Sequence, residues 1–259
     1  MDKNSPIGVF DSGIGGLTVL ESLKALMPQE NFIYLADDAF YPYGTKTKSA
    51  IENRVLTIGK AFIKKDVKAI VIACNTASAN AQKLINWAKI PIITVIEPTA
   101  LAAFNQSQAK KIAVIATKLT ISLGMYQNYL EEWQAKVYSL ATSELVPLAE
   151  SPNRQSAETK AQVLEIVKPL LNKDFDTLIL GCTHFGLLKE ALADIFPHAQ
   201  LVACGEATAI KLKNELERLD LMTERKSQGS VELLCSRHPE CYLDKIDWLS
   251  FKYRKPRTW

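Results

Sequence analysis

The sequence predicts an α/β protein with two pseudo-symmetric domains, each a mainly parallel sheet flanked by helices. Short apolar runs rich in β-branched residues alternate with longer amphipathic segments. Several runs, such as IVIA and LILG, are apolar on both alternating faces, which is typical of parallel strands covered by helices on both sides. A weak internal repeat suggests that two domains share one plan.

The expected elements follow from these runs and from proline stop signals. Helices are expected over Leu17–Met27, which stops at Pro28, over Thr76–Lys89, and over Phe185–Phe196, which stops at Pro197. The expected strands are Ile7–Phe10, Phe32–Leu35, Ala69–Ala73, Ile92–Ile96, Ile112–Ala116, Val137–Leu140, Thr177–Leu180, Leu201–Ala203 and Val231–Leu234.

The repeat pairs two strand–turn–helix segments with two others. AIVIACNTASANAQ resembles TLILGCTHFGLLKE, and IGVFDSGIGGLTV lies upstream of the first as IAVIATKLTISLG lies upstream of the second. Asp11 precedes Cys74 by 63 residues, and Thr117 precedes Cys182 by 65. We therefore expect a first domain of residues 1–97 plus 206–259, carrying Asp11 and Cys74. The second domain, residues 98–205, would carry Glu150, Cys182 and His184.

Composition excludes several classes of protein. Of 259 residues, 47% are hydrophobic and 23% are charged, so a sizeable core is expected. A net charge of only +3 argues against a nucleic-acid binder. The sequence contains no run of 18 apolar residues, so no membrane span is expected. It contains no signal-type segment, so export is not expected. We expect a cytoplasmic protein whose five cysteines are free thiols.

Two cysteines occupy equivalent places in the repeat. Cys74 and Cys182 each follow a buried-type strand and precede a helix, where helix N–H groups favour the thiolate. The Asn75-Thr76 and Thr183-His184 pairs that follow offer donors for a substrate carboxylate. One such cysteine would more often be a buried inert thiol, but two at matched positions favour chemistry.

The DSGIGG segment begins at Asp11 and Ser12, which can cap the next helix or assist the Cys74 thiol. A dinucleotide-binding fingerprint is excluded because Thr18 stands where the third glycine belongs. Further on, Tyr43 and Gly44 lie in a turn, YPYG, which alone predicts only a loop.

An acid–base pair is suggested beside the second cysteine. His184 lies two residues after Cys182, and Glu150 follows the apolar run LVPLA, from which it can orient the imidazole. A structural role for either residue remains open.

The C-terminal region offers weaker signals. Cys235, His238 and Cys241 have metal-type spacing, but a structural zinc site needs a fourth ligand, which Cys204 would supply only through folding. We expect no metal. The basic tail FKYRKPRTW is expected to be a solvated tail, with a partner contact as the alternative.

Taken together, these motifs resemble the glutamate racemases of the aspartate/glutamate racemase superfamily. The GCTH sequence resembles the glutamate branch rather than the aspartate branch. The matching segments, in family order over most of the chain, are GVFDSGIGGLTV, PYG, ACNTASA, VIEP, ELVPLAE and GCTHF.

The resemblance implies two α/β domains with the active site between them and cofactor-independent interconversion of L- and D-glutamate for bacterial peptidoglycan. Cys74 and Cys182 would be the acid/base pair, assisted by Asp11 on one side and by His184 and Glu150 on the other. The resemblance implies that neither a cofactor nor a metal is needed and that the partner is a small molecule, glutamate. It is compatible with a homodimer. The residues expected to bind substrate are Asp11, Ser12, Tyr43, Gly44, Asn75, Thr76, Thr183 and His184, with Thr117 a weaker candidate.

Three positions depart from the family pattern. Phe40 stands where an arginine often precedes VPYG, Gly186 where proline commonly follows the GCTH-aromatic motif, and Ala203 where an aspartate is usual. None is a proton-transfer residue, so the departures concern the rim of the site rather than the reaction class.

Other functions remain open. Three alternatives are a racemase of aspartate or a hydantoin-type acid, a one-cysteine decarboxylase, and a protein that binds a ligand without catalysis. The second cysteine disfavours the decarboxylase, and the paired thiols disfavour pure binding.

Overall fold

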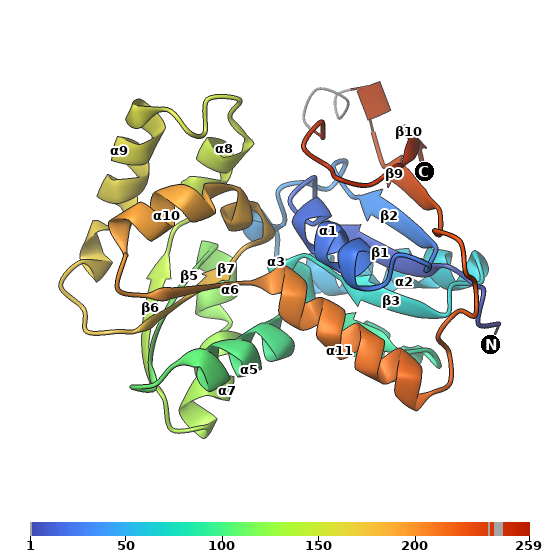
Figure 1. The fold of residues 1–259 in the computed structure, drawn as a ribbon, viewed down its shortest axis with the longest axis horizontal. Coiled ribbons are helices and arrows are strands. Elements are labelled where there is room, and N and C mark those ends of the chain that lie inside the picture. Colours follow the sequence, from blue (N-terminus) through green and yellow to red (C-terminus); the bar gives the residue numbers. More distant parts are fainter. Residues whose placement is uncertain (1, 238, 241–245) are drawn as a thin grey trace. The chain divides into compact units, whose positions relative to one another are not determined.

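The computed structural model describes residues 2–237, 239–240 and 246–259. The chain forms two compact units, Met1–Val95 with Gly205–Trp259, and Ile96–Cys204 (Figure 1). The chain thus passes between units at residues 95/96 and 204/205, against the predicted boundaries at 97/98 and 205/206.

Unit 1 contains an all-parallel six-stranded sheet of order β10-β9-β2-β1-β3-β4. Its strands are β1 (Ile7–Asp11), β2 (Phe32–Ala36), β3 (Ala69–Ile72), β4 (Ile92–Thr94), β9 (Val231–Cys235) and β10 (Arg254–Thr258). Its helices are α1 (Leu17–Leu26), the 3₁₀ turn η1 (Tyr43–Thr45), α2 (Lys48–Lys64), α3 (Asn75–Ser78), α4 (Gln82–Trp87) and α11 (Cys204–Arg218), whose first residue belongs to unit 2.

Helices cover β1 on both faces. The Phe62 ring of α2 packs against Gly8 and lies 6.4 Å, centroid to centroid, from the ring of Phe10. Asp11 points the other way, toward Gly16 at the start of α1, as strand alternation requires. All five β1 residues are therefore buried, which explains the continuous apolar pattern.

Unit 2 contains an all-parallel four-stranded sheet of order β6-β5-β7-β8. Its strands are β5 (Lys111–Ala116), β6 (Lys136–Ala141), β7 (Thr177–Gly181) and β8 (Gln200–Ala203). Its helices are α5 (Ile96–Gln106), α6 (Lys118–Ser122), α7 (Met125–Glu132), α8 (Leu145–Glu150), α9 (Ala157–Val167), η2 (Lys168–Leu170), η3 (Thr183–Leu188) and α10 (Lys189–Ile195).

The two sheets repeat one topology. The order β2-β1-β3-β4 in unit 1 corresponds to β6-β5-β7-β8 in unit 2. Cys74 follows β3 and Cys182 follows β7, so each cysteine lies beyond the carboxyl end of a central strand. Ligands usually bind at this edge of an open parallel sheet.

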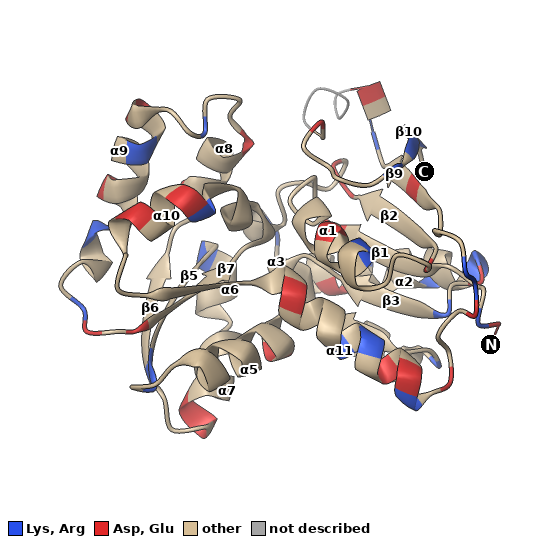
Figure 2. Ribbon diagram, in the orientation of Figure 1, with Lys and Arg blue, Asp and Glu red and all other residues tan. Residues whose placement is uncertain are grey.

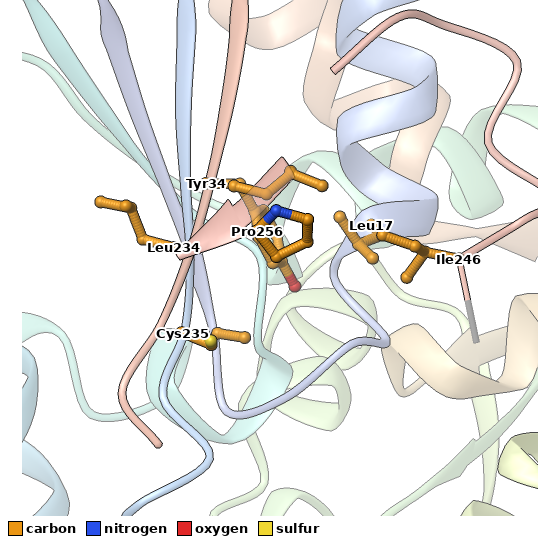
Figure 3. Close-up of a pocket in the computed structure, with 8 residues that line it drawn as sticks. Leu17, Tyr34, Leu234, Cys235, Ile246 and Pro256 are labelled. Carbon is orange, nitrogen blue, oxygen red and sulfur yellow. The ribbon is translucent and has the colours of Figure 1, made fainter. Parts of the chain in front are cut away.

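The prediction of a solvated tail was wrong, because residues 254–258 form β10, which pairs in parallel with β9. Charged side chains and a proline are common on edge strands, where they discourage further pairing. Pro256 is the one buried residue of β10. It lines a small apolar pocket together with Leu17, Tyr34, Leu234, Cys235 and Ile246 (Figure 3).

Helix boundaries also differ from the predictions. The segment expected as one helix over Thr76–Lys89 is divided into α3 and α4, with Ala79, Asn80 and Ala81 between them. The helix expected over Phe185–Phe196 begins instead as the 3₁₀ helix η3 at Thr183 and continues as α10. Apolar periodicity predicts that a segment is helical but places helix boundaries poorly, so it did not locate these breaks.

Acidic and basic residues are interspersed along α9, α10 and α11 (Figure 2). The small positive net charge therefore forms no continuous stripe on these helices. None of the helices in the described part of the chain has the length and apolar character that a bilayer crossing requires.

A buried ion pair joins distant parts of unit 1. Lys68 Nζ lies 2.6 Å from Glu30 Oε2, and both side chains are at most 1% exposed. Lys68 also donates to the carbonyls of Lys3 and Leu221, while Glu30 accepts from the amide of Thr223. Burial lowers the pKa of Lys68, so the charged lysine depends on these acceptors.

We predict that Glu30→Gln lowers the free energy of unfolding by about 3–5 kcal/mol, because it leaves a buried ammonium without its counter-charge. Urea denaturation monitored by circular dichroism would measure this loss. Asp174→Asn removes the partner of Lys111 in an exposed pair and should leave the denaturation midpoint unchanged. Equal midpoints for all three proteins would contradict the prediction.

Candidate active site

Cys74 lies at the N-terminus of α3, and its thiol is 6% exposed. Its Sγ accepts a hydrogen bond from the Ala77 amide at 3.4 Å and lies 3.7 Å from Ser12 Oγ, to which the thiol donates. Ser78 fixes α3 on the sheet, because its hydroxyl donates to the Ile72 carbonyl and accepts from the Val95 amide. The first cysteine thus has the helix-start environment predicted for it.

Asp11 ends β1, next to the strand that leads to Cys74, and its side chain is fully buried. Its carboxylate accepts from the Gly13 amide at 3.0 Å, and the Tyr34 hydroxyl donates to the Gly13 carbonyl at 2.7 Å. The N-cap of α1 is Gly16, without a side-chain hydrogen bond. The alternative that Asp11 or Ser12 caps this helix was therefore wrong: Asp11 shapes the turn before it.

Gly16 is required by close packing at this turn. A Cβ atom there would lie 2.5 Å from Asp11 Cβ and 2.8 Å from the Tyr34 hydroxyl. Any side chain at residue 16 would therefore displace Asp11.

Tyr43 is held by two residues that sequence reasoning missed. Its hydroxyl donates to Asp37 Oδ2 at 2.6 Å, and Arg54 Nε donates to the same oxygen at 2.7 Å. Arg54 Nη2 also donates to Asp37 Oδ1. Asp37 follows β2 at the same sheet edge as Asp11 and Cys74, and this position was the available sequence signal.

The Tyr43 hydroxyl stays protonated. Burial raises the pKa of Tyr43 far above its usual value, and the nearby Asp37 and Cys74 side chains raise it further. Tyr43 therefore lies within electrostatic reach of Cys74.

Cys182 belongs to a thiol–imidazole–carboxylate series in unit 2. Its Sγ lies 3.7 Å from His184 Nδ1, and His184 Nε2 lies 2.9 Å from Glu150 Oε1. Cys182 is 8% exposed, His184 is 3% exposed, and Glu150 is partly accessible at the end of α8. The structure thus assembles the three residues that the sequence singled out.

A second tyrosine, Tyr126, packs against the residue before Cys182. The Tyr126 ring approaches Gly181, where a Cβ atom would lie 3.1 Å from Cε2. Burial raises the pKa of Tyr126, and Cys204 and Cys182 contribute. Its hydroxyl lies 3.8 Å from Cys204 Sγ, which donates to the Leu180 carbonyl.

The thiols and metal-type residues fit no metal site within the described residues. The four described cysteines, at positions 74, 182, 204 and 235, form no disulfide with one another, and no group of three or more Cys, His, Asp or Glu among the described residues is arranged to hold a metal. His238 and Cys241 of the cysteine–histidine segment lie outside the described residues.

The remaining candidates lie at element starts. Asn75 and Thr76 begin α3, and Thr183 begins η3, all three buried. Thr117 caps α6 by accepting from the Thr120 amide. Gly44 is exposed in η1.

The departing positions occupy ordinary places in the fold. The Phe40 ring packs edge-on against Tyr43 at 5.5 Å. Gly186 lies inside η3, and Ala203 ends β8 opposite Leu180.

Each unit therefore provides one thiol with groups suited to moving a proton. In unit 1 a hydroxyl and a helix amide contact the thiol, and a carboxylate ends the adjacent strand. In unit 2 an imidazole and a carboxylate act in series, as in activated thiols of other enzymes.

Comparison with known proteins gives consistent matches. Residues 14–211 match the Asp/Glu/Hydantoin racemase family. A glutamate racemase of Exiguobacterium sibiricum is 40% identical over 83% of this chain and 80% of its own.

Solved structures agree along nearly the whole chain. A glutamate racemase isoform from Bacillus anthracis has a TM-score of 0.93 at 31% identity, covering 99% of this chain and 98% of its own. A glutamate racemase from Francisella tularensis, solved in complex with D-glutamate, has a TM-score of 0.91 at 30% identity with the same coverage.

We predict that Glu150→Gln slows alkylation of Cys182 by iodoacetamide about tenfold at pH 7, because an imidazolium without its carboxylate forms less readily and stabilises the thiolate less. Peptide mass spectrometry would measure the rate at each cysteine. Cys74 in the same protein is the internal control and should react unchanged. An unaltered Cys182 rate would show that the His184–Glu150 contact does not activate this thiol.

Proposed function

The chain belongs to the Asp/Glu/Hydantoin racemase family, and we propose that it interconverts L- and D-glutamate through two cysteine thiols that transfer protons at the α-carbon. Membership makes it an isomerase that racemises amino acids. The observation that carries the proposal is one buried thiol beyond the carboxyl end of the equivalent strand in each unit, Cys74 after β3 and Cys182 after β7.

Racemisation requires a proton to leave one face of the α-carbon and another to arrive at the opposite face. In one direction the Cys74 thiolate removes the proton and the Cys182 thiol delivers one; in the other direction their states are exchanged. A single base would mainly return the proton to the face from which it came. Two thiols therefore suit inversion better than one.

Different groups assist the two thiols in proton transfer. On the Cys182 side, His184 takes up or returns the thiol proton, and Glu150, 2.9 Å away, stabilises the imidazolium. On the Cys74 side, Ser12 contacts the thiol directly and Asp11 assists it. We assign both sets to catalysis on this basis.

The α-hydrogen is a weak acid, so the developing negative charge needs hydrogen-bond donors at the α-carboxylate. Asn75, Thr76 and Thr183 begin short helical segments beside the thiols and are suited to this role. The proposed substrate-binding set is completed by Asp11, Ser12, Tyr43, Gly44 and His184.

Glutamate is proposed as substrate because the similar proteins are named glutamate racemases and one was solved with D-glutamate. The product D-glutamate would supply peptidoglycan synthesis. The mechanism needs no cofactor, since both proton carriers are side chains.

The first test is racemisation of L-glutamate, and separately of D-glutamate, in D₂O without added cofactor. Polarimetry should show both solutions converging to zero rotation, with mass spectrometry showing one α-deuterium per converted molecule. Folded protein that neither changes the rotation nor incorporates deuterium would refute glutamate as substrate. Turnover of aspartate in a parallel sample would then reassign the specificity.

We predict that Cys74→Ser and Cys182→Ser each lose racemase activity by at least ~100-fold, because a serine hydroxyl is too weak an acid to serve as either carrier. Steady-state rates in both directions would measure the loss. Cys235→Ser, in unit 1 but buried against the Arg257 carbonyl, is the matched control and should keep near-normal turnover. Near wild-type turnover by either active-site variant would refute the two-base mechanism.

A further inference from the structure

We propose that Asp37 and Arg54 are positioning residues for substrate binding, because together they hold the Tyr43 hydroxyl and so place the Tyr43–Gly44 segment. This inference rests on the proposed function, in which that segment binds glutamate. Neither residue is assigned to proton transfer.

Asp37 contacts both β1 and the proposed binding segment, Tyr43–Gly44. Its backbone amide donates to the Asp11 carbonyl at 2.9 Å, which fixes Asp37 at the end of β1. Its fully buried carboxylate accepts from the Tyr43 hydroxyl and from two nitrogens of Arg54. Asp37 thus ties β1, η1 and α2 to one point.

The carboxylate oxygens are occupied by this arrangement. Oδ2 accepts from Tyr43 and Arg54, and Oδ1 accepts from Arg54. A planar guanidinium fits both oxygens at once and neutralises the buried charge, which an ammonium cannot do with the same geometry. The hydrogen bond to Asp37 also raises the pKa of Arg54.

Phe40 completes the support. Its ring packs edge-on against Tyr43 and lies beneath the Arg54 guanidinium, whose central carbon is 5.8 Å from the ring centroid. Lys46 Nζ lies 5.4 Å from the same centroid. Phe40 therefore brings two cations to its own ring, which packs against Tyr43.

The consequence for Tyr43 is chemical as well as geometric. Its hydroxyl proton is committed to Asp37, and its raised pKa keeps that proton in place. Loss of the hydrogen bond would release the side chain and the loop, while both thiols keep their own partners. The expected effect is weaker substrate binding with little change in turnover.

The test compares Tyr43→Phe, Asp37→Asn, Arg54→Lys and Arg54→Met. Tyr43→Phe removes only the hydroxyl and leaves the Asp37–Arg54 pair intact, so it remains informative if Asp37→Asn folds poorly. For each of Tyr43→Phe, Asp37→Asn and Arg54→Met we expect KM for glutamate to rise about tenfold and kcat to stay within about threefold, the signature of lost uniform binding. Arg54→Lys should recover part of the loss.

The double variant Asp37→Asn/Tyr43→Phe should be no worse than the poorer single variant, because both changes break the same hydrogen bond. The matched control is Arg218→Met, which breaks an exposed two-nitrogen arginine–carboxylate pair with Glu215 on α11 and should leave KM and kcat unchanged. Unchanged KM in Tyr43→Phe and Arg54→Met, or a fall in kcat that matches the change in kcat/KM, would overturn the proposal.

A second readout separates this inference from the proposed function. Hydrogen–deuterium exchange of the backbone amides of residues 40–46 should be at least about tenfold faster in Asp37→Asn than in wild type, whether or not glutamate is the substrate. Unchanged exchange would overturn the positioning role. If wild-type protein fails to racemise glutamate but exchange in Asp37→Asn is faster as expected, the proposed function is refuted and the positioning role of Asp37 and Arg54 stands.

Discussion

Parallel pairing of β1 with β3 and of β5 with β7 is the constraint on which the candidate site depends. Because the strands run in the same direction, the residues that follow them emerge at one edge of each sheet. Asp11 and Cys74 meet this edge in unit 1, and Thr117 and Cys182 meet it in unit 2. Full burial of both strand faces keeps the register fixed, since slippage would move apolar side chains off both helix layers.

The two thiols share a position but not an environment. Cys74 contacts a hydroxyl and a helix amide, which are neutral groups, whereas Cys182 contacts an imidazole paired with a carboxylate. In unit 2, His184 can accept a proton, and the Glu150 carboxylate offsets the resulting positive charge. Under the proposed mechanism the two proton transfers are therefore chemically different even though the overall reaction is symmetric, with an equilibrium constant of one fixed by the enantiomers themselves.

Two buried charges in unit 1 are paired with counter-charges. Asp37 is paired with Arg54 next to the Tyr43–Gly44 segment, and Lys68 is paired with Glu30 at the opposite end of the strands. An unpaired charge at either place would carry a desolvation penalty larger than a typical hydrogen bond returns. The Lys68–Glu30 pair joins the N-terminal and C-terminal segments of the unit. The Asp37–Arg54 pair holds the Tyr43 side chain near Cys74.

The sequence by itself determined the parallel α/β class, the repeat and the two cysteines, because burial on both strand faces and matched spacing are local properties of the chain. It also indicated His184 and Glu150. Only the tertiary structure brought Glu150 to the imidazole, since Glu150 and His184 are 34 positions apart along the chain. Likewise β10 and the Asp37–Arg54 pair were missed, because strand pairing and ion pairing depend on which distant segments become neighbours, and a charged edge strand has the composition of a solvated tail.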